Sequence, residues 1–437
     1  MDKKKCFNEF ARYSILSILG TLGVSCYILA DTFFVSNGLG NKGLTALNLA
    51  IPVYNFIHGT GLMLGMGGAT KFSISKSQRD SKRMDIIFTN TVYLAILFSV
   101  LFLLLGVFCA RPLAVLLGAD SDAAVLNMTI TYLRWLLIFA PAFIMNDVLL
   151  CFVRNDDSPQ LAMGAMLVGS FSNIVLDYIF IFPMNMGIFG AIFATGLSPI
   201  ISIIMMSPHW IRKKNEFHFV HTRLESEVVK QDFSIGFPSL IGQVSSGIVM
   251  ITFNALILKL EGNIGVAAYG VIANISLVVV AIYTGLAQGV QPLISSAYGT
   301  ENKAYIKLLH RYSMVTMLII SGVIYLLLVV FSEQIVSVFN SENNILLQSI
   351  AEEGMVLYFT SNLFAGYNII IATFFTSMEN VVPAHVLSLL RGLVLIVPLA
   401  FLMSALWGMK GIWLTYPATE LITAVIGLEI KRRYDKI

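Results

Sequence analysis

Runs of about twenty apolar residues recur along the whole chain, and they limit the possible folds more than any other feature. A helix of that length spans the hydrocarbon core of a bilayer. By hydropathy we count twelve runs, at 14–36, 46–70, 86–109, 127–152, 161–183, 187–208, 234–258, 265–290, 311–332, 353–376, 384–405 and 410–430. Only 12% of the 437 residues are charged, about half the usual globular fraction. The sequence therefore predicts an all-α polytopic membrane protein with twelve transmembrane helices.

Basic residues are distributed unevenly between alternate loops. We count 22 of the 28 Lys and Arg at the two termini and in the even-numbered loops, in the segments 3–12, 71–83, 154, 212–230, 303–311 and 431–436. The odd-numbered loops have only Lys42, Arg111, Lys259 and Lys410. Because short cytoplasmic loops are enriched in Lys and Arg, we expect both termini to be cytoplasmic. The small net charge of +3 then reflects topology, and we expect no nucleic acid partner.

The two halves of the chain repeat at nearly one offset. Pairs recur 222 positions apart, for example Gly67 and Gly289, Ser73 and Ser295, and Asn146 and Asn368. The polar stretch 212–232 separates an N-terminal lobe at 1–211 from a C-terminal lobe at 233–437. Since each lobe has six spans, both lobes begin on the same side of the membrane. We therefore expect a pseudo-twofold axis along the membrane normal, with a central cavity between the lobes.

Polar residues in the fifth and sixth spans predict a cation site. Asn173 and Asp177 are four residues apart, so they share one face of a helix, and Thr195 lies in the next span. Asp31 in the first span shares their depth, roughly 8–12 Å below the outer surface at ~1.5 Å per residue. A carboxylate in a bilayer is costly, and this set of oxygens suits H⁺, Na⁺ or a similar small cation. The alternative is two unrelated acids that reach the interface or satisfy backbone groups.

The second lobe lacks this set, because Asp31 corresponds to Phe253 at the repeat offset. Further candidates for the lining of a substrate cavity are Tyr27, Asn146, Asp147, Gln243, Asn368 and Glu420. Glu420 either faces the cavity or belongs to a buried structural pair, and Asp147 either faces the cavity or pairs with Arg154. Arg391 is expected to neutralise an acid or to extend its charge to the interface, and His58 is expected to be structural.

The stretches ADTFFVSNGLGNKGLTALNLAIP (30–52), 173–177 and GIFGAIFAT (187–195) resemble the MATE (multidrug and toxic compound extrusion) transporters of the MOP flippase superfamily. The chain looks closest to their bacterial DinF-like and MepA-like branch, and the resemblance covers essentially its whole length. It implies a cation site made of an Asp on the first helix, an Asn and an Asp four apart on the fifth, and a Thr on the sixth. Those roles fall on Asp31, Asn173, Asp177 and Thr195.

Two features depart from the family pattern. Relatives that bend their first helix do so at a proline, and here no proline precedes Pro52. The NorM-like branch places acids on its seventh and tenth helices. In this chain the seventh span has Gln243 as its polar residue, and the tenth has Glu352 and Glu353 only at its outer end. The resemblance therefore implies a cation site in the N-terminal lobe alone.

The expected function is that of a secondary active multidrug efflux antiporter in a bacterial inner membrane. It would export amphipathic, cationic organic compounds in exchange for H⁺ or Na⁺, without a cofactor, as a monomer among membrane lipids. One alternative is a lipid-linked precursor flippase of the same superfamily, which needs a cationic cavity; only Arg391 and Arg134 are available for that. An intramembrane enzyme is a weaker alternative, since we find no His/Glu metal motif, no Gly-x-Ser-x-Gly and no nucleotide loop.

Overall fold

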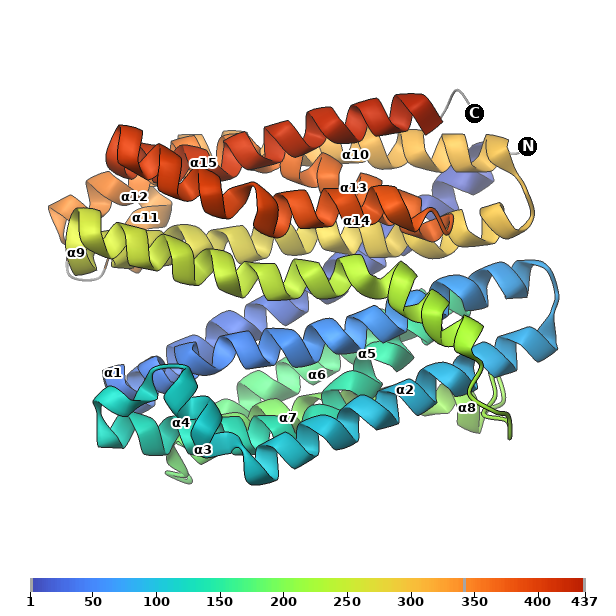
Figure 1. The fold of residues 1–437 in the computed structure, drawn as a ribbon, viewed down its shortest axis with the longest axis horizontal. Coiled ribbons are helices and arrows are strands. Elements are labelled where there is room, and N and C mark those ends of the chain that lie inside the picture. Colours follow the sequence, from blue (N-terminus) through green and yellow to red (C-terminus); the bar gives the residue numbers. More distant parts are fainter. Residues whose placement is uncertain (1–2, 341–342, 435–437) are drawn as a thin grey trace.

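The computed structural model describes residues 3–340 and 343–434, and nearly all of them are helical (Figure 1). Lys436, counted above among the basic residues, lies outside the described residues. The helices of the first half are α1 (Lys3–Ser77), α2 (Ser81–Phe108), α3 (Ala110–Leu116), α4 (Ala123–Ile138), α5 (Ala140–Asn155), α6 (Pro159–Ile181), α7 (Gly187–Met206) and α8 (Pro208–Ile211). Those of the second half are α9 (Ser226–Gly299), α10 (Lys303–Val330), α11 (Ser332–Phe339), α12 (Ile345–Tyr358), α13 (Asn362–Ser377), α14 (Val381–Leu389) and α15 (Ile396–Tyr434). Short 3₁₀ turns lie at Ala119–Ser121 and Phe359–Ser361, and a π-helical turn at Leu390–Val394.

Three of the long helices each consist of two transmembrane helices that are joined at a glycine. The joints are Gly40 in α1 (φ 67°), Gly262 in α9 (φ 62°) and Gly408 in α15 (φ 58°). Each combines a positive φ with an extended ψ, a backbone conformation that is essentially restricted to glycine. Gly262 follows Gly40 by 222 positions, and Gly408 follows Gly187, also at positive φ, by 221. The chain therefore reverses at equivalent glycines in both halves.

The number of transmembrane helices agrees with the twelve apolar runs. Eight helices are long and apolar enough to cross a membrane, and α4 with α5 forms a ninth span that is bent by 46°. Pro141 lies in the first turn of α5 just after this bend, where a missing N–H costs no helix hydrogen bond. Division of α1, α9 and α15 at their glycines brings the described chain to twelve transmembrane helices, which confirms the predicted fold class.

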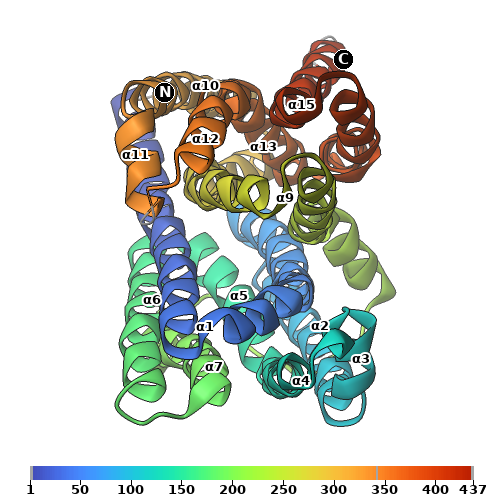
Figure 2. The ribbon, with the colours of Figure 1, turned by 90° about the vertical axis from the view of Figure 1, so that its left-hand side faces the viewer.

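The twelve helices form two six-helix lobes, which Figure 2 shows from one end of the bundle. One hydrophobic core is built from residues between Val35 and Val228, and the other mainly from residues between Phe253 and Trp413. The first turns of α1 pack into the second lobe, and the first turns of α9 pack into the first lobe. Cys6 and Phe10 of α1 lie in the second core, and Val228 of α9 lies in the first. The starts of α1 and α9 thus cross from one lobe to the other.

The two ends of the described chain and the connection between α8 and α9 lie at the same end of the bundle, which we call the terminal end (Figure 1). The lobes are in backbone contact there. A Cβ atom added to Gly236 would lie 1.8 Å from the Met63 carbonyl oxygen, and one added to Gly289 would lie 2.7 Å from that of Tyr13. Only glycine permits such close helix crossings, so the lobes are packed together toward the terminal end.

Candidate functional site

The structure brings together three of the four residues that were predicted to bind a cation, and places the fourth beside them. Asn173 and Asp177 lie one turn apart on α6, and Thr195 faces them from α7. Asp31 comes from the first half of α1, and its carboxyl group is close enough to Asp177 for the two charges to interact. Asp177 is 0% exposed and Asp31 7% exposed. The expected set of oxygens is therefore assembled inside the first lobe.

The side-chain amide of Asn173 links Asp177 to Thr195 by hydrogen bonds. It satisfies both neighbours when its nitrogen donates to Oδ2 of Asp177 at 3.0 Å and its oxygen accepts from the Thr195 N–H at 3.1 Å. In the opposite orientation the amide nitrogen lies 3.4 Å from the Thr195 hydroxyl. That hydroxyl donates to the Ala191 carbonyl at 3.0 Å, so its lone pairs face the site.

Both acids keep an oxygen that has no partner in the described part of the chain. Oδ1 of Asp31 and Oδ1 of Asp177 are buried and have no hydrogen-bond partner. A buried polar atom without a partner is costly, and a proton or a bound cation would relieve that cost. No cluster of three or more His, Cys, Asp and Glu suited to a metal ion occurs among residues 3–340 and 343–434. The oxygen and amide groups present suit a proton or a hard monovalent cation.

Tyr132 of α4 is part of the same site, although the sequence did not identify it. It is buried, it lies within hydrogen-bonding reach of the Thr195 side chain, and it interacts electrostatically with Asp31 and Asp177. No sequence signal marked Tyr132, because a tyrosine in an apolar run is usually part of the core. Its phenol can donate one hydrogen bond and also accept hydrogen bonds.

A second polar group adjoins the first along α1. The hydroxyls of Tyr27 and Tyr54 lie 2.6 Å apart, and each tyrosine interacts electrostatically with Asp31 and with Asp147. Asp147 is buried on α5, and its Oδ2 lies 2.8 Å from Nδ1 of His58. The two tyrosines therefore lie between the two acidic groups.

The predicted alternative of an Asp147–Arg154 pair is wrong. Arg154 instead donates to Gln288 of the second lobe at 2.9 Å. Asp147 is able to approach α1 because Gly61 has no side chain; a Cβ there would lie 2.6 Å from Oδ2 of Asp147. The spacing of Tyr54 and His58, four residues apart, was the available signal for a shared helix face, and their rings stack at 6.0 Å.

Glu420 and Asn368 were predicted to line the substrate cavity, but they are bound to each other. Asn368 donates to Oε2 of Glu420 at 2.6 Å, and Arg391 donates to Oε1 from two nitrogens at 3.1 and 2.7 Å. Glu420 is 1% exposed. This corrects the reading of Glu420 as a free cavity acid and leaves the alternative, a buried pair, with Arg391 neutralising the acid as expected.

The two remaining cavity candidates are half-buried. Gln243 lies on α9 against Gly59 of α1. A Cβ atom added to Gly59 would lie 3.0 Å from the Cβ atom of Gln243. Asn146 lies on α5 beside Asp147, and its Oδ1 is buried without a partner. Gln243 thus lies where the two lobes face each other.

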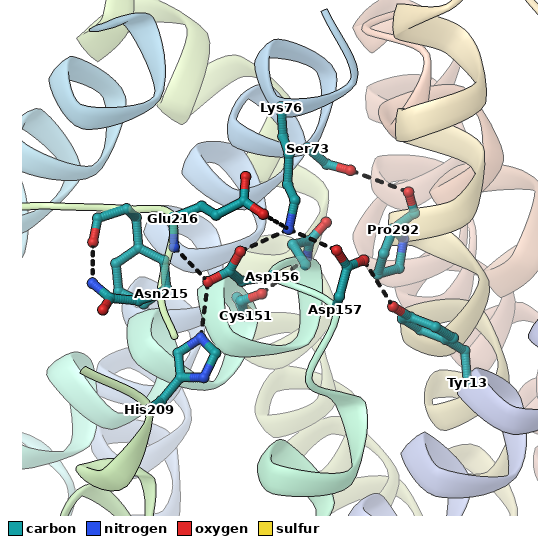
Figure 3. A network of polar contacts seen from close by, with 12 residues as sticks. Tyr13, Ser73, Lys76, Cys151, Asp156, Asp157, His209, Asn215, Glu216 and Pro292 are labelled. Carbon is teal, nitrogen blue, oxygen red and sulfur yellow. Dashed lines mark hydrogen bonds and ion pairs between the residues drawn. The ribbon is translucent and has the colours of Figure 1, made fainter. Parts of the chain in front are cut away.

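A cluster of charged groups at the terminal end joins α1 to the segments that follow α5 and α8 (Figure 3). Lys76 at the end of α1 forms ion pairs with Asp156, Asp157 and Glu216 at 2.7, 2.8 and 3.3 Å. Asp156 also accepts from Nε2 of His209 at 2.8 Å and from the Glu216 N–H at 2.9 Å. Burial raises the pKa of Asp156, but these hydrogen bonds and the charge of Lys76 outweigh it, and the net pKa is lowered.

Comparisons with known proteins agree with this fold. The MatE family model matches residues 17–179 and 238–402. The chain is 25% identical over 431 residues to the multidrug export protein MepA of Staphylococcus saprophyticus, covering 98% of this chain and 94% of the relative. It is 24% identical over 432 residues to MepA of Staphylococcus aureus strain MRSA252, with the same coverage. A solved structure described as the outward-facing conformation of a multidrug resistance MATE family transporter of the MOP superfamily superposes with a TM-score of 0.91 at 23% identity, over 99% of this chain and 96% of that one.

Proposed function

Because the chain belongs to the MatE family of membrane transporters, we propose that it is a multidrug efflux antiporter that exports amphipathic organic cations in exchange for H⁺ or Na⁺. The observation that carries the proposal is the pair of buried acids, Asp31 and Asp177, each with an unpartnered oxygen. A group that alternates between protonated and ionised, or between cation-bound and empty, is what coupled transport requires. The MepA relatives are multidrug export proteins, which supports the same substrate class.

Transport would proceed by alternating access of two lobes, predicted at 1–211 and 233–437. The linker predicted at 212–232 overlaps the first turns of α9, which begins at Ser226. In the structure the lobes are packed at the terminal end, where Gly236 meets Met63 and Gly289 meets Tyr13. With the terminal end in the cytoplasm, as the basic loops predict, this is a state closed toward the cytoplasm. Opening toward the cytoplasm requires these crossings to separate.

The coupling cation would be held by Asp31, Asn173, Asp177 and Thr195, with Tyr132 beside them. Two acids within electrostatic range cannot both be ionised without cost, so at least one is expected to take up a proton or share a cation. Both H⁺ and Na⁺ suit the oxygens present. Site residues on the second lobe are not needed for this step, since Glu420 is already paired with Arg391.

This pairing also bears on the flippase alternative. A lipid pyrophosphate needs several free cationic groups, and the main candidate, Arg391, is bound to Glu420 at 2.7 Å. The antiporter is therefore the better supported of the two functions.

The test is transport in proteoliposomes that contain the purified protein and a fluorescent organic cation, with the pH gradient and the Na⁺ gradient imposed separately. We expect one of the two gradients to drive cation movement, and the Asp31→Asn/Asp177→Asn variant to lose it while still folding. Asp85→Asn, on α2 outside the cation site and paired with His218, is the matched control and should transport normally. Full gradient-driven transport by the double variant would exclude the site.

A further inference from the structure

Asp232 is a buried acid at the terminal end that the cation site does not use. It lies in the first turns of α9, where this helix reaches across onto α1 and α2 of the first lobe, and it is 0% exposed. A Cβ atom on Gly67 of α1 would lie 2.2 Å from the Asp232 carbonyl oxygen. The acid is therefore enclosed at one of the closest crossings between α1 and α9.

The hydrogen bonds of this carboxyl group fit its protonated form. Its Oδ2 lies 2.8 Å from the Thr91 hydroxyl oxygen, and its Oδ1 has no partner. The same hydroxyl lies 2.9 Å from the Ile87 carbonyl, the usual acceptor for a threonine within a helix. Because a hydroxyl has a single proton, Thr91 either shares that proton between the two acceptors or makes two full hydrogen bonds, with the carboxyl group of Asp232 supplying the second proton.

The neighbouring charges are engaged elsewhere. Lys71 of α1 and Arg83 of α2 interact electrostatically with Asp232, but Lys71 is bound to Glu379, and Arg83 to Glu225 at 2.7 Å. On the α14 side, His385 contacts the Ser234 carbonyl at 2.6 Å. Within the described part of the chain, no basic side chain forms an ion pair with Asp232. A buried carboxylate without such a partner is costly, so the neutral acid suits the closed crossing.

In the equivalent crossing of the other half, the position that corresponds to Asp232 holds no acid. There the first half of α1 packs on the second half of α9, and Gly289 meets Tyr13 and Ser14. At the repeat offset, Asp232 corresponds to Phe10, which lies in the second hydrophobic core. The architecture of the crossing therefore does not require a carboxyl group.

We propose that Asp232 is a second proton-binding site, protonated while the terminal end is closed and ionised once the lobes separate there and water reaches it. This inference rests on the alternating-access function proposed above. On opening, the carboxyl O–H bond breaks and its proton passes to water on the terminal side; closing requires the proton to return. Because the closed state binds one more proton, the ratio of closed to open molecules falls by up to about tenfold per pH unit between the titration ranges of the two states.

The test is a distance measurement between the lobes at the terminal end. Nitroxide labels are placed on Lys82→Cys of α2 and Lys307→Cys of α10, both at exposed positions, after replacement of the native cysteines Cys6, Cys26, Cys109 and Cys151. The protein carries Asp31→Asn and Asp177→Asn, so that the cation site cannot contribute to the pH response. Distances are measured by electron–electron double resonance in lipid nanodiscs between pH 5 and pH 9.

We expect the ratio of molecules with the longer distance to molecules with the shorter distance to rise at least tenfold between pH 5 and pH 9. Adding Asp232→Asn, which imitates the protonated acid, should hold the short distance at every pH, whereas adding Asp85→Asn should leave the pH response intact. Asp232→Ser is the second neutral variant, in case the Asn variant does not fold. A pH-independent distribution in the protein that retains Asp232, or an unchanged response after its neutralisation, would overturn the proposal. Neither result depends on transport, so failure of the antiport proposal in proteoliposomes is a separate outcome.

Discussion

Arg391 of the second lobe holds the Glu420 carboxylate with two hydrogen bonds to one oxygen, from Nε at 3.1 Å and Nη2 at 2.7 Å. Asn368 binds the other oxygen at 2.6 Å, so the buried acid is fully satisfied. The side chain of Arg391 is 20% exposed. The acids of the first lobe differ, because Asp31 and Asp177 each keep an unpartnered oxygen. The second lobe thus holds a neutralised ion pair, whereas the first lobe holds two buried acids with unpartnered oxygens.

Removal of Arg391 should be strongly destabilising. Arg391→Met leaves the Glu420 charge buried and unpaired, at a cost of about 3–5 kcal/mol, whereas the Arg391→Met/Glu420→Met variant should recover most of that loss. Thermal unfolding of the purified variants in detergent checks both. If the single variant were as stable as the wild type, the pair would not be a buried ion pair in the folded protein.

The helix crossing at Gly236 should not tolerate a methyl group. Gly236→Ala brings a carbon atom 1.8 Å from the Met63 backbone oxygen, which cannot move aside as a side chain can, so we expect a loss of about 1–3 kcal/mol or separation of the lobes at the terminal end. Gly242→Ala, on the same helix with nothing within 4 Å of the added atom, should be neutral or gain up to about 1 kcal/mol from helix propensity. The unfolding temperatures of the two purified variants test this prediction, and equal temperatures for both would contradict it.

The charged cluster around Asp156 should stabilise the fold above about pH 4. The pKa of Asp156 is lower in the folded protein than in the unfolded chain, so its contribution is present above the unfolded-state pKa and is lost as pH falls through the folded-state pKa. Asp156→Asn removes this charge. The stability of the variant should therefore change less than that of the wild type between pH 5 and pH 2. Thermal unfolding across this range is the measurement, and parallel curves for the two proteins would contradict the assignment.

Much of the fold was accessible from the sequence because hydropathy reports membrane spans directly. The chain reversals were less accessible. Gly40, Gly262 and Gly408 are ordinary glycines in the sequence, and only the structure shows that each marks a turn with positive φ between two spans. The crossing-over of the starts of α1 and α9 also left no local signal, since Phe10 and Val228 look like any apolar residue near a span.

Partners of buried polar side chains were the hardest feature to predict. The sequence offered Arg154 as a partner for Asp147 because Asp147 lies toward the cytoplasmic end of its span, where Arg154 follows. The structure pairs Asp147 with His58, which Gly61 allows by leaving room on α1. Tyr132 joins the cation site from α4 through tertiary packing alone. Spacing within one helix predicts a shared face, but contacts between helices depend on how the bundle packs.

The transported cation and protons should compete for the acid pair in the first lobe. Moving one charge across the membrane is worth ~2.3 kcal/mol per 100 mV, so one-for-one exchange of a proton for a monovalent organic cation is electroneutral and is driven by the pH gradient alone, whereas two protons per cation make it electrogenic. If the two cations compete through Asp31 and Asp177, the apparent affinity for an organic cation should fall as pH drops through the titration range of these acids. Equilibrium binding of a fluorescent organic cation to protein in nanodiscs, from pH 5 to pH 9, measures this.

Asp177→Asn should remove much of the pH dependence of this binding, while Asp85→Asn, on α2 outside the cation site, should preserve it. Glu420 should contribute little to the attraction of cations, because its charge is balanced by Arg391 at 2.7 Å. The Arg391→Met/Glu420→Met variant, which removes both charges together, should therefore bind the cation with nearly the wild-type pH profile. A flat affinity in the wild type would exclude competition at the acid pair. A steep profile that vanished in the Arg391→Met/Glu420→Met variant would move the coupling to the second lobe.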